Sequence, residues 1–194
     1  MAESYVIGVD FGSDSVRALI VNTETGENVG QGVACYPRWK AGLYQHPEYS
    51  IFRQHPLDYL ESLEKCITTA LAELTEEQKD HVIGIGVDTT GSTPVPVDKN
   101  GTPLALLDEF AENENAMFFL WKDHAAAAEA DEINKLFRNN SENDYTKYQG
   151  DYSAEWYWAK ILYAVRHDEA IRQAAYTWEE HCDWMTGILC GETR

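Results

Sequence analysis

A short turn near the start of the chain carries the residue types that phosphate sites use. Asp10 ends an apolar run and is followed closely by small, hydroxyl and basic residues: Gly12, Ser13, Ser15 and Arg17. A tight turn between two strands directs backbone N–H groups into one concavity, and a glycine lets a phosphate approach closely. Hydroxyls and a guanidinium add donors, and a carboxylate at a strand end can hold Mg²⁺ through water. The pattern predicts a phosphate and magnesium site, although such a turn is also typical of an ordinary hairpin.

The tetrapeptide Ile-Gly-Val-Asp occurs twice, at residues 7–10 and 85–88. Each copy ends a predicted strand, and the second copy is followed by Gly91 and Ser92. Ligands of open α/β sheets bind at the edge formed by the carboxyl ends of the strands. We therefore expect both aspartates at one edge of one sheet. Chance recurrence of a common strand pattern is the alternative.

The surrounding segments predict an α/β fold, because strand and helix patterns alternate along the chain. Three antiparallel strands are expected between residue 5 and about residue 35, and a strand at 82–87 should run parallel to the first. Leucines at three- and four-residue spacing predict an amphipathic helix at 57–74 that packs on the sheet. Further elements are expected as strands at 94–97 and 117–121 and as helices at about 123–137, 153–166 and 183–189, the last ended by Gly191.

The amino-acid composition indicates which classes of partner and which cellular compartment suit this chain. The 194 residues are 44% hydrophobic and 12% aromatic, which is typical of a packed domain, and we take 1–194 as one domain. The net charge of -18 disfavours nucleic acid and anionic membranes as partners. Four cysteines lack zinc spacing, and neither a leader nor an apolar run of membrane-spanning length occurs. These features favour the cytoplasm.

Four motifs, taken in order, resemble those of the FGGY carbohydrate kinase family. Segment 9–17 is similar to the first phosphate motif shared by actin, heat-shock chaperones and sugar kinases. Segments 84–98, 120–124 and 183–191 resemble the second strand with its sugar-side turn, the W-x-D segment in its ribulokinase version, and the D-[WY]-[LM]-T segment. The resemblance covers nearly the whole chain. It implies an actin-like (ribonuclease H-like) ATPase domain, with a mixed central sheet flanked by helices and an incomplete first lobe.

The resemblance assigns roles to individual positions. Asp10 would contact Mg²⁺ or its water, and the β- and γ-phosphates of ATP would be lined by Gly12, Ser13, Ser15 and Arg17. The sugar would lie against Gly91 and Ser92, in a pocket shaped by Trp121 and Asp123. Each assignment has a structural alternative: Arg17 as a strand-surface charge, Trp121 as a core aromatic, and Asp123 as the N-cap of the following helix. Asp14 departs from the family pattern, since a carboxylate there opposes phosphate unless it points outward or toward the metal.

The activity that the resemblance implies is transfer of the ATP γ-phosphoryl group to L-ribulose, giving L-ribulose 5-phosphate in L-arabinose catabolism. The family places its catalytic base in a second actin-like domain, so no catalytic residue is expected among these residues, and we expect them to be inactive alone. The alternatives are a related kinase of xylulose, glycerol or gluconate and an actin-like nucleotide-binding lobe without kinase activity. The expected ligands are ATP, Mg²⁺ and a ketopentose, and a homodimer is left open.

Overall fold

The structure is a computed structural model that describes residues 3–140, 142 and 144–192. These residues form two compact units. Unit 1 comprises residues 3–43 and 55–90, and unit 2 comprises residues 44–54 and 91–192. In the described residues, no helix combines the length and apolarity needed to cross a bilayer.

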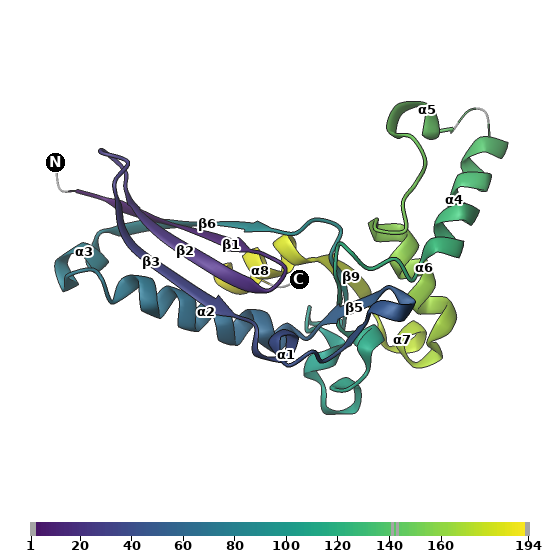
Figure 1. The fold of residues 1–194 in the computed structure, drawn as a ribbon, viewed down its shortest axis with the longest axis horizontal. Helices are drawn as coiled ribbons and strands as arrows, with labels where there is room; N and C mark the ends of the chain where they lie inside the picture. Colours follow the sequence, from purple (N-terminus) through teal and green to yellow (C-terminus); the bar gives the residue numbers. More distant parts are fainter. Residues whose placement is uncertain (1–2, 141, 143, 193–194) are drawn as a thin grey trace. The chain divides into compact units, whose positions relative to one another are not determined.

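Unit 1 is built on a four-stranded sheet in the order β3-β2-β1-β6 (Figure 1). The strands are β1 (Tyr5–Phe11), β2 (Ser15–Asn22), β3 (Asn28–Cys35) and β6 (Val82–Thr89). The first three pair antiparallel, and β6 pairs parallel with β1. Both predictions for this sheet are confirmed. In β1, alternate residues are buried, as expected for a strand with one covered face: Tyr5, Ile7, Val9 and Phe11.

Helix α2 (Pro56–Leu71) covers one face of this sheet, where it packs against β2 and β3. It begins with proline at its first turn, and the His55 side chain accepts a hydrogen bond from the Leu57 amide. The backbones of α2 and β3 lie very close together. A Cβ added to Gly32 would lie 2.1 Å from the Cys66 carbonyl oxygen, so this position requires glycine.

That close approach corrects the predicted helix face in part. Of the leucine stripe at 57–74, Leu63 and Leu74 are buried as predicted, whereas Leu57 and Leu60 are only half-buried. Where α2 passes the β3 glycines, the residues that it buries are small, namely Cys66 and Ala70. At Gly30 and Gly32 the backbone of the helix comes so near, at Ala70 and Cys66, that no side chain fits between the two backbones. The helix also ends at Leu71, before the predicted end.

Two short helices complete unit 1: α1 (Pro37–Lys40) and α3 (Glu76–Asp80). The buried carboxylate of Asp58 fastens α1 to α2, because it accepts hydrogen bonds from the backbone amides of Arg38 and Trp39 and from the Arg38 guanidinium. The remaining guanidinium donors of Arg38 bind Glu61, which lowers the pKa of Glu61. Helix α3 begins with a capping box formed by Thr75 and Gln78.

Unit 2 contains two small sheets. One has the order β4-β5-β8, from β4 (Gln45–His46), β5 (Ile51–Gln54) and β8 (Phe118–Phe119), and the other pairs β7 (Pro94–Val97) with β9 (Thr177–Glu180). Its α-helices are α4 (Ala127–Asn139), α5 (Thr146–Gln149), α6 (Tyr157–His167), α7 (Glu169–Ala174) and α8 (His181–Cys190). Its single-turn 3₁₀ helices are η1 (Pro47–Tyr49), η2 (Leu104–Leu106), η3 (Asp108–Phe110) and η4 (Glu114–Ala116).

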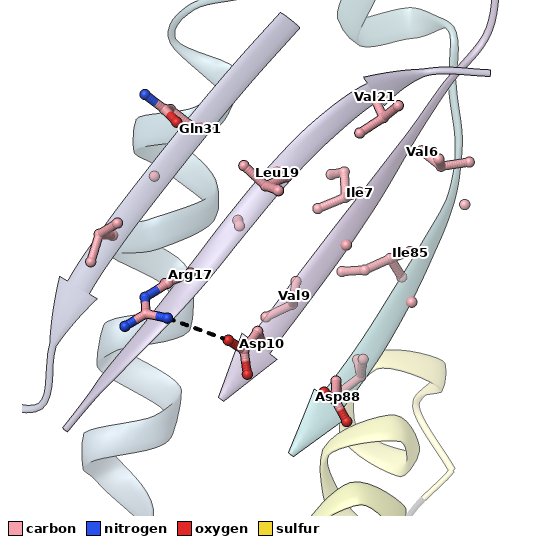
Figure 2. A pocket seen from close by; sticks show the side chains of 17 residues that line it. Val6, Ile7, Val9, Asp10, Arg17, Leu19, Val21, Gln31, Ile85 and Asp88 are labelled. Atoms are coloured by element: carbon pink, nitrogen blue, oxygen red, sulfur yellow. Dashed lines mark ion pairs between the residues drawn. The ribbon is translucent and has the colours of Figure 1, made fainter. Parts of the chain in front are cut away.

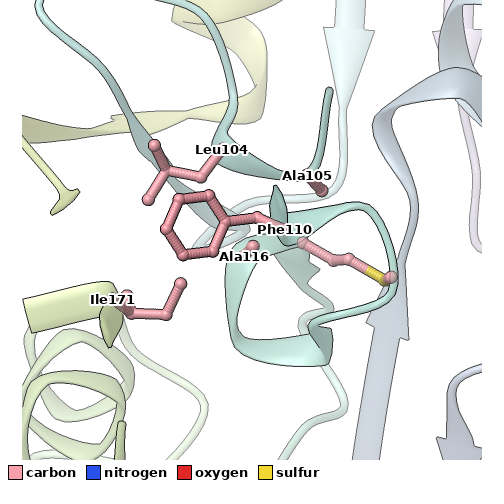
Figure 3. Packing of buried hydrophobic residues seen from close by; sticks show 6 residues of the cluster. Leu104, Ala105, Phe110, Ala116 and Ile171 are labelled. Atoms are coloured by element: carbon pink, nitrogen blue, oxygen red, sulfur yellow. The ribbon is translucent and has the colours of Figure 1, made fainter. Parts of the chain in front are cut away.

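Two apolar clusters hold unit 2 together. In the first, Ile171 of α7 packs with residues of the 3₁₀ segments (Figure 3): Leu104, Ala105, Phe110, Ala116 and Met117. In the second, α4 and α6 meet through alanines: Ala126, Ala130 and Ala159. Small side chains at this contact let the two helices approach closely.

Several predicted boundaries in unit 2 need correction. The strand expected at 117–121 has two residues, Phe118–Phe119. The helix expected from residue 123 begins at Ala127, because the Asp123 carboxylate accepts a hydrogen bond from the Ala125 amide and the intervening residues form turns. The helix expected at 153–166 begins at Tyr157. The strand at Pro94–Val97 is confirmed, and Gly191 ends α8 with φ of 71°, as predicted.

Candidate functional site

The β1–β2 hairpin brings Asp10 and Arg17 together. They are direct cross-strand partners, and Arg17 Nη1 lies 3.7 Å from Asp10 Oδ2 (Figure 2). Both side chains are more than half exposed, at 52% for Asp10 and 62% for Arg17. An ion pair this exposed contributes at most about 1 kcal/mol to folding. A ligand can therefore reach the pair, and breaking the ion pair to bind a ligand would cost little folding free energy.

The turn between these two residues is closed by its own hydrogen bonds. The Gly12 amide donates to the Ser15 carbonyl at 2.9 Å, and the buried Ser15 hydroxyl donates to the Asp14 carboxylate at 3.0 Å. A Cβ on Gly12 would lie 3.2 Å from the Ser15 carbonyl oxygen, which is a tight contact. Two of the donors predicted to meet phosphate, the Gly12 amide and the Ser15 hydroxyl, are thus engaged inside the turn. Asp14 itself is exposed.

Tyr36 supports the turn from beneath, a role that sequence reasoning missed. Its hydroxyl donates to the Gly12 carbonyl at 3.2 Å, and its amide donates to the Asp14 carbonyl at 3.0 Å. The ring is fully buried and packs edge-on against Tyr59, with centroids 5.3 Å apart. Burial raises the pKa of the Tyr36 hydroxyl, and electrostatic repulsion from the acidic groups nearby, those of Tyr59, Asp10 and Asp14, raises it further. Tyr36 therefore remains a neutral hydrogen-bond donor.

The two Ile-Gly-Val-Asp copies lie side by side in the sheet. Asp10 of β1 and Asp88 of β6 are register partners in the parallel ladder, as Figure 2 shows at the ends of both strands. Neighbouring strands lie about 4.8 Å apart, so these exposed carboxylates share one sheet edge. The expectation of a common edge is confirmed. Within the described ranges, no cluster of three or more His, Cys, Asp or Glu side chains has the arrangement of a complete metal site.

The face of the sheet opposite α2 forms a shallow groove of about 1080 Å³ (Figure 2). Asp10, Arg17 and Asp88 lie at one end of it, and apolar side chains and glycines line the rest. At Gly8 and Gly86 an added Cβ would have no neighbour within 4 Å. The groove thus joins a charged end to an apolar floor.

The predicted sugar-side turn lies in unit 2 and has a strained backbone. Gly91 is exposed, and Ser92 adopts a left-handed φ of 53°, which non-glycine residues rarely do. Thr93 is fully buried, and its amide donates to Glu180 Oε1 at 2.5 Å. Burial raises the pKa of Glu180. The exposed part of the turn is therefore anchored through the buried residue that follows it.

Trp121 and Asp123 occupy very different environments. Trp121 is 43% exposed, so the interpretation as a core aromatic does not hold. Asp123 is fully buried, where it forms an ion pair with Arg53 and accepts a hydrogen bond from the Phe52 amide at 2.7 Å. The helix-cap alternative is wrong, because the N-cap of α4 is Ala126. In this structure the Asp123 carboxylate holds β5 against the segment that carries Trp121.

Lys160 of α6 is a second residue that sequence reasoning missed. It is fully buried, and its Nζ donates to the backbone carbonyls of Ser92 and of Leu120, the latter at 2.9 Å. Burial lowers its pKa to about 7. The amphipathic pattern of α6 gave no signal for this role, because a lysine between apolar residues is typical of an exposed helix position.

The comparisons of this chain with known proteins all indicate the same family. Residues 5–193 match the model of the FGGY family of carbohydrate kinases, N-terminal domain. The chain is 54% identical over 188 residues to a ribulokinase of Vibrio parahaemolyticus, which covers 96% of this chain and 33% of the relative. It is 38% identical to a ribulokinase of Mycolicibacterium smegmatis, over 98% of this chain and 35% of the relative. The chain thus spans about a third of the length of these relatives.

Solved structures share the fold at low sequence identity. A glycerol kinase of Plasmodium falciparum with ADP matches with a TM-score of 0.72 and 15% identity, over 98% of this chain and 35% of that one. A xylulose kinase of Bifidobacterium adolescentis matches with a TM-score of 0.71 and 18% identity, over 97% and 34%. These neighbours confirm the expected actin-like α/β fold. The chain belongs to the FGGY family of carbohydrate kinases, and residues 5–193 correspond to the N-terminal domain of that family.

Proposed function

We propose that these residues are the N-terminal part of an ATP-dependent ribulokinase that phosphorylates L-ribulose to L-ribulose 5-phosphate. The observation that carries the proposal is the 54% identity, over 96% of this chain, to a ribulokinase. The exposed Asp10–Arg17 pair at the end of a hairpin supports it, because it offers a carboxylate for a cation beside a guanidinium for a phosphate.

On the nucleotide side, Asp10 would hold Mg²⁺ or its water, and Arg17 would line the β- and γ-phosphates of ATP. The neighbouring carboxylate of Asp88 suits a divalent cation, since Mg²⁺ prefers oxygen ligands and few of them from protein. Bound Mg²⁺ would neutralise charge on the β- and γ-phosphates. Ser13 and the turn backbone line the phosphates. The Gly12 amide and the Ser15 hydroxyl are engaged inside the closed turn, so the turn must open or shift before they can donate to a phosphate. Local positive charge from Arg17 is needed because the chain carries a net charge of -18.

On the sugar side, Gly91, Ser92 and the exposed Trp121 contact the ketopentose. Asp123 acts on the pocket through Trp121 rather than by direct contact, because its carboxylate is buried and engaged by Arg53. The catalytic base lies outside these 194 residues, so they are inactive when expressed alone. Phosphoryl transfer depends on positioning both substrates and on neutralising charge, and these residues supply only part of each. We place the enzyme in the cytoplasm.

The test is an ADP-coupled assay of the full-length protein with a panel of acceptors. The panel contains L-ribulose, D-ribulose, D-xylulose, glycerol and gluconate, each at several concentrations with Mg²⁺ and ATP held constant. We expect the highest kcat/KM with L-ribulose. A higher kcat/KM with glycerol, gluconate or xylulose would reassign the substrate, and nucleotide binding without acceptor-dependent turnover would remove the kinase proposal.

A further inference from the structure

The buried ammonium of Lys160 joins two backbone segments that are far apart in the sequence. One acceptor is the carbonyl of Ser92, in the turn that follows β6, and the other is the carbonyl of Leu120, directly before Trp121. Both contacts lie within unit 2. The two segments that the proposed function assigns to the sugar are therefore held by one side chain.

The Ser92 end of this link is held under strain. Ser92 has φ of 53°, and a non-glycine residue keeps such a backbone only where its surroundings fix it. Two side chains do so here, since the buried Lys160 binds the Ser92 carbonyl and the half-buried Glu180 accepts from the next amide, that of Thr93. The peptide between Ser92 and Thr93 is thus held at both its oxygen and its nitrogen.

The Leu120 end continues into a second buried network. The Leu120 carbonyl also accepts from the Asp123 amide at 2.9 Å, and the Asp123 carboxylate pairs with Arg53, whose guanidinium lies 3.5 Å above the Phe119 ring. Residues 120 to 123 are thereby fixed on the inside, while Trp121 remains exposed. A hydrogen bond in a dry site is electrostatically stronger than the same bond in water.

We propose that Lys160 is a positioning residue for the acceptor side of the site, which sets the placement of the Gly91–Ser92 turn relative to Trp121. The proposal rests on the assignment of those residues to the ketopentose. Lys160 does not touch the sugar in this scheme, because its Nζ is buried and engaged by backbone carbonyls. Its loss would change how well the sugar fits and would leave the nucleotide side, in unit 1, as it is.

The first test measures hydrogen exchange by mass spectrometry on the 194-residue chain. Lys160→Met keeps the volume and removes every donor, Lys160→Gln keeps one amide donor group, and Lys135→Met on the exposed surface of α4 is the matched control. We expect faster exchange in peptides covering 89–95 and 118–124 for Lys160→Met, a smaller increase for Lys160→Gln, and wild-type rates for Lys135→Met. Peptides covering 5–22 should not change.

The second test measures steady-state kinetics of the same variants in the full-length protein. For Lys160→Met we expect kcat/KM for the sugar to fall by about 10- to 100-fold, chiefly through KM, because misplacement by about 1 Å can cost on the order of 10². The KM for ATP should stay within about twofold. A purely structural role would lower the active fraction, and hence kcat, without raising the sugar KM selectively.

The outcomes separate this inference from the proposed function. Unchanged exchange at 89–95 and 118–124, an equal increase across all peptides, or an unchanged sugar KM each overturns the role of Lys160. If circular dichroism shows that Lys160→Met is unfolded, the Lys160→Gln variant decides by the same criteria. If the wild-type protein phosphorylates no ketopentose, the proposed function fails, and exchange alone then decides whether Lys160 joins the two segments.

Discussion

Asp10 and Asp88 occupy equivalent positions on adjacent parallel strands, and each is the last residue of an Ile-Gly-Val-Asp copy. The two carboxylates lie at the same sheet edge, and Asp10 forms an ion pair across the hairpin with Arg17. The repeated tetrapeptide therefore corresponds to a structural repeat within one sheet. It puts two negative charges beside one positive charge at the end of the open groove.

Asp10→Asn in the full-length protein should lower kcat by about 10²–10³, the usual effect of removing one preorganised charge-stabilising group. The neutral amide keeps the shape of the side chain but binds a cation poorly. The ADP-coupled assay with L-ribulose measures the change. Asp131→Asn, an exposed substitution on α4, is the control and should retain wild-type turnover. Wild-type kcat in Asp10→Asn would remove Asp10 from the nucleotide site.

Gly32→Ala should destabilise the fold strongly, by about 2–4 kcal/mol, because its Cβ would lie 2.1 Å from a backbone carbonyl of α2 and the helix must move away. Gly8→Ala is the matched control on the opposite face of the sheet, where the added Cβ has open space. It should change the free energy of unfolding by less than about 1 kcal/mol. Urea denaturation followed by circular dichroism measures both. Equal stability of the two variants would contradict the close helix–sheet contact.

Asp123→Asn should cost about 3–5 kcal/mol of unfolding free energy, because it leaves the buried guanidinium of Arg53 without its counter-charge. The exposed Asp131→Asn serves as control here as well, with an expected change within about 0.5 kcal/mol. Replacing both partners, as in Arg53→Met with Asp123→Leu, should recover much of the loss. If Asp123→Asn is as stable as wild type but binds sugar poorly, Asp123 contacts the substrate directly.

Stability should fall on the acid side of neutrality because of His181. Burial lowers the pKa of this histidine to about 3 from the ordinary value of 6.5, so the unfolded chain binds the proton first. Above pH 6.5 His181 is neutral in both the folded and the unfolded chain, so its titration does not lower the free energy of unfolding. As the pH falls from 6.5 toward 3, the unfolded chain takes up the proton and the free energy of unfolding decreases. Between pH 7.5 and 5, wild type should lose about 2 kcal/mol more unfolding free energy than His181→Gln. Parallel losses in both proteins would show that His181 does not titrate on unfolding.

The unit 1 sheet could be predicted because its signals are local. Alternating apolar residues mark β1, and Gly12 and its neighbours mark the turn, so the Asp10–Arg17 pairing follows from the hairpin itself. The buried face of α2 could not be predicted in the same way. It depends on how closely Gly30 and Gly32 let the helix approach, which is a property of two distant segments together.

Unit 2 was less predictable because its strands are very short. β4 and β8 have two residues each, too few for an alternating pattern, and β9 contains the acidic pair Glu179 and Glu180. The roles of Lys160 and Tyr36 could not be predicted for a related reason. A lysine or tyrosine in a sequence gives no indication that its polar atom will meet a backbone carbonyl from a distant segment, because only the fold brings the two together.

The strand order of unit 1 has a mechanical consequence for its two carboxylates. β1 is hydrogen-bonded to a strand on each side, whereas β6 stands at the border of the sheet among the described residues. Displacing the end of β1 would break two ladders at once, and displacing the end of β6 would break one. Asp10 is thus carried by an interior strand of the sheet, while Asp88 is carried by a border strand whose end can be displaced at the cost of one ladder.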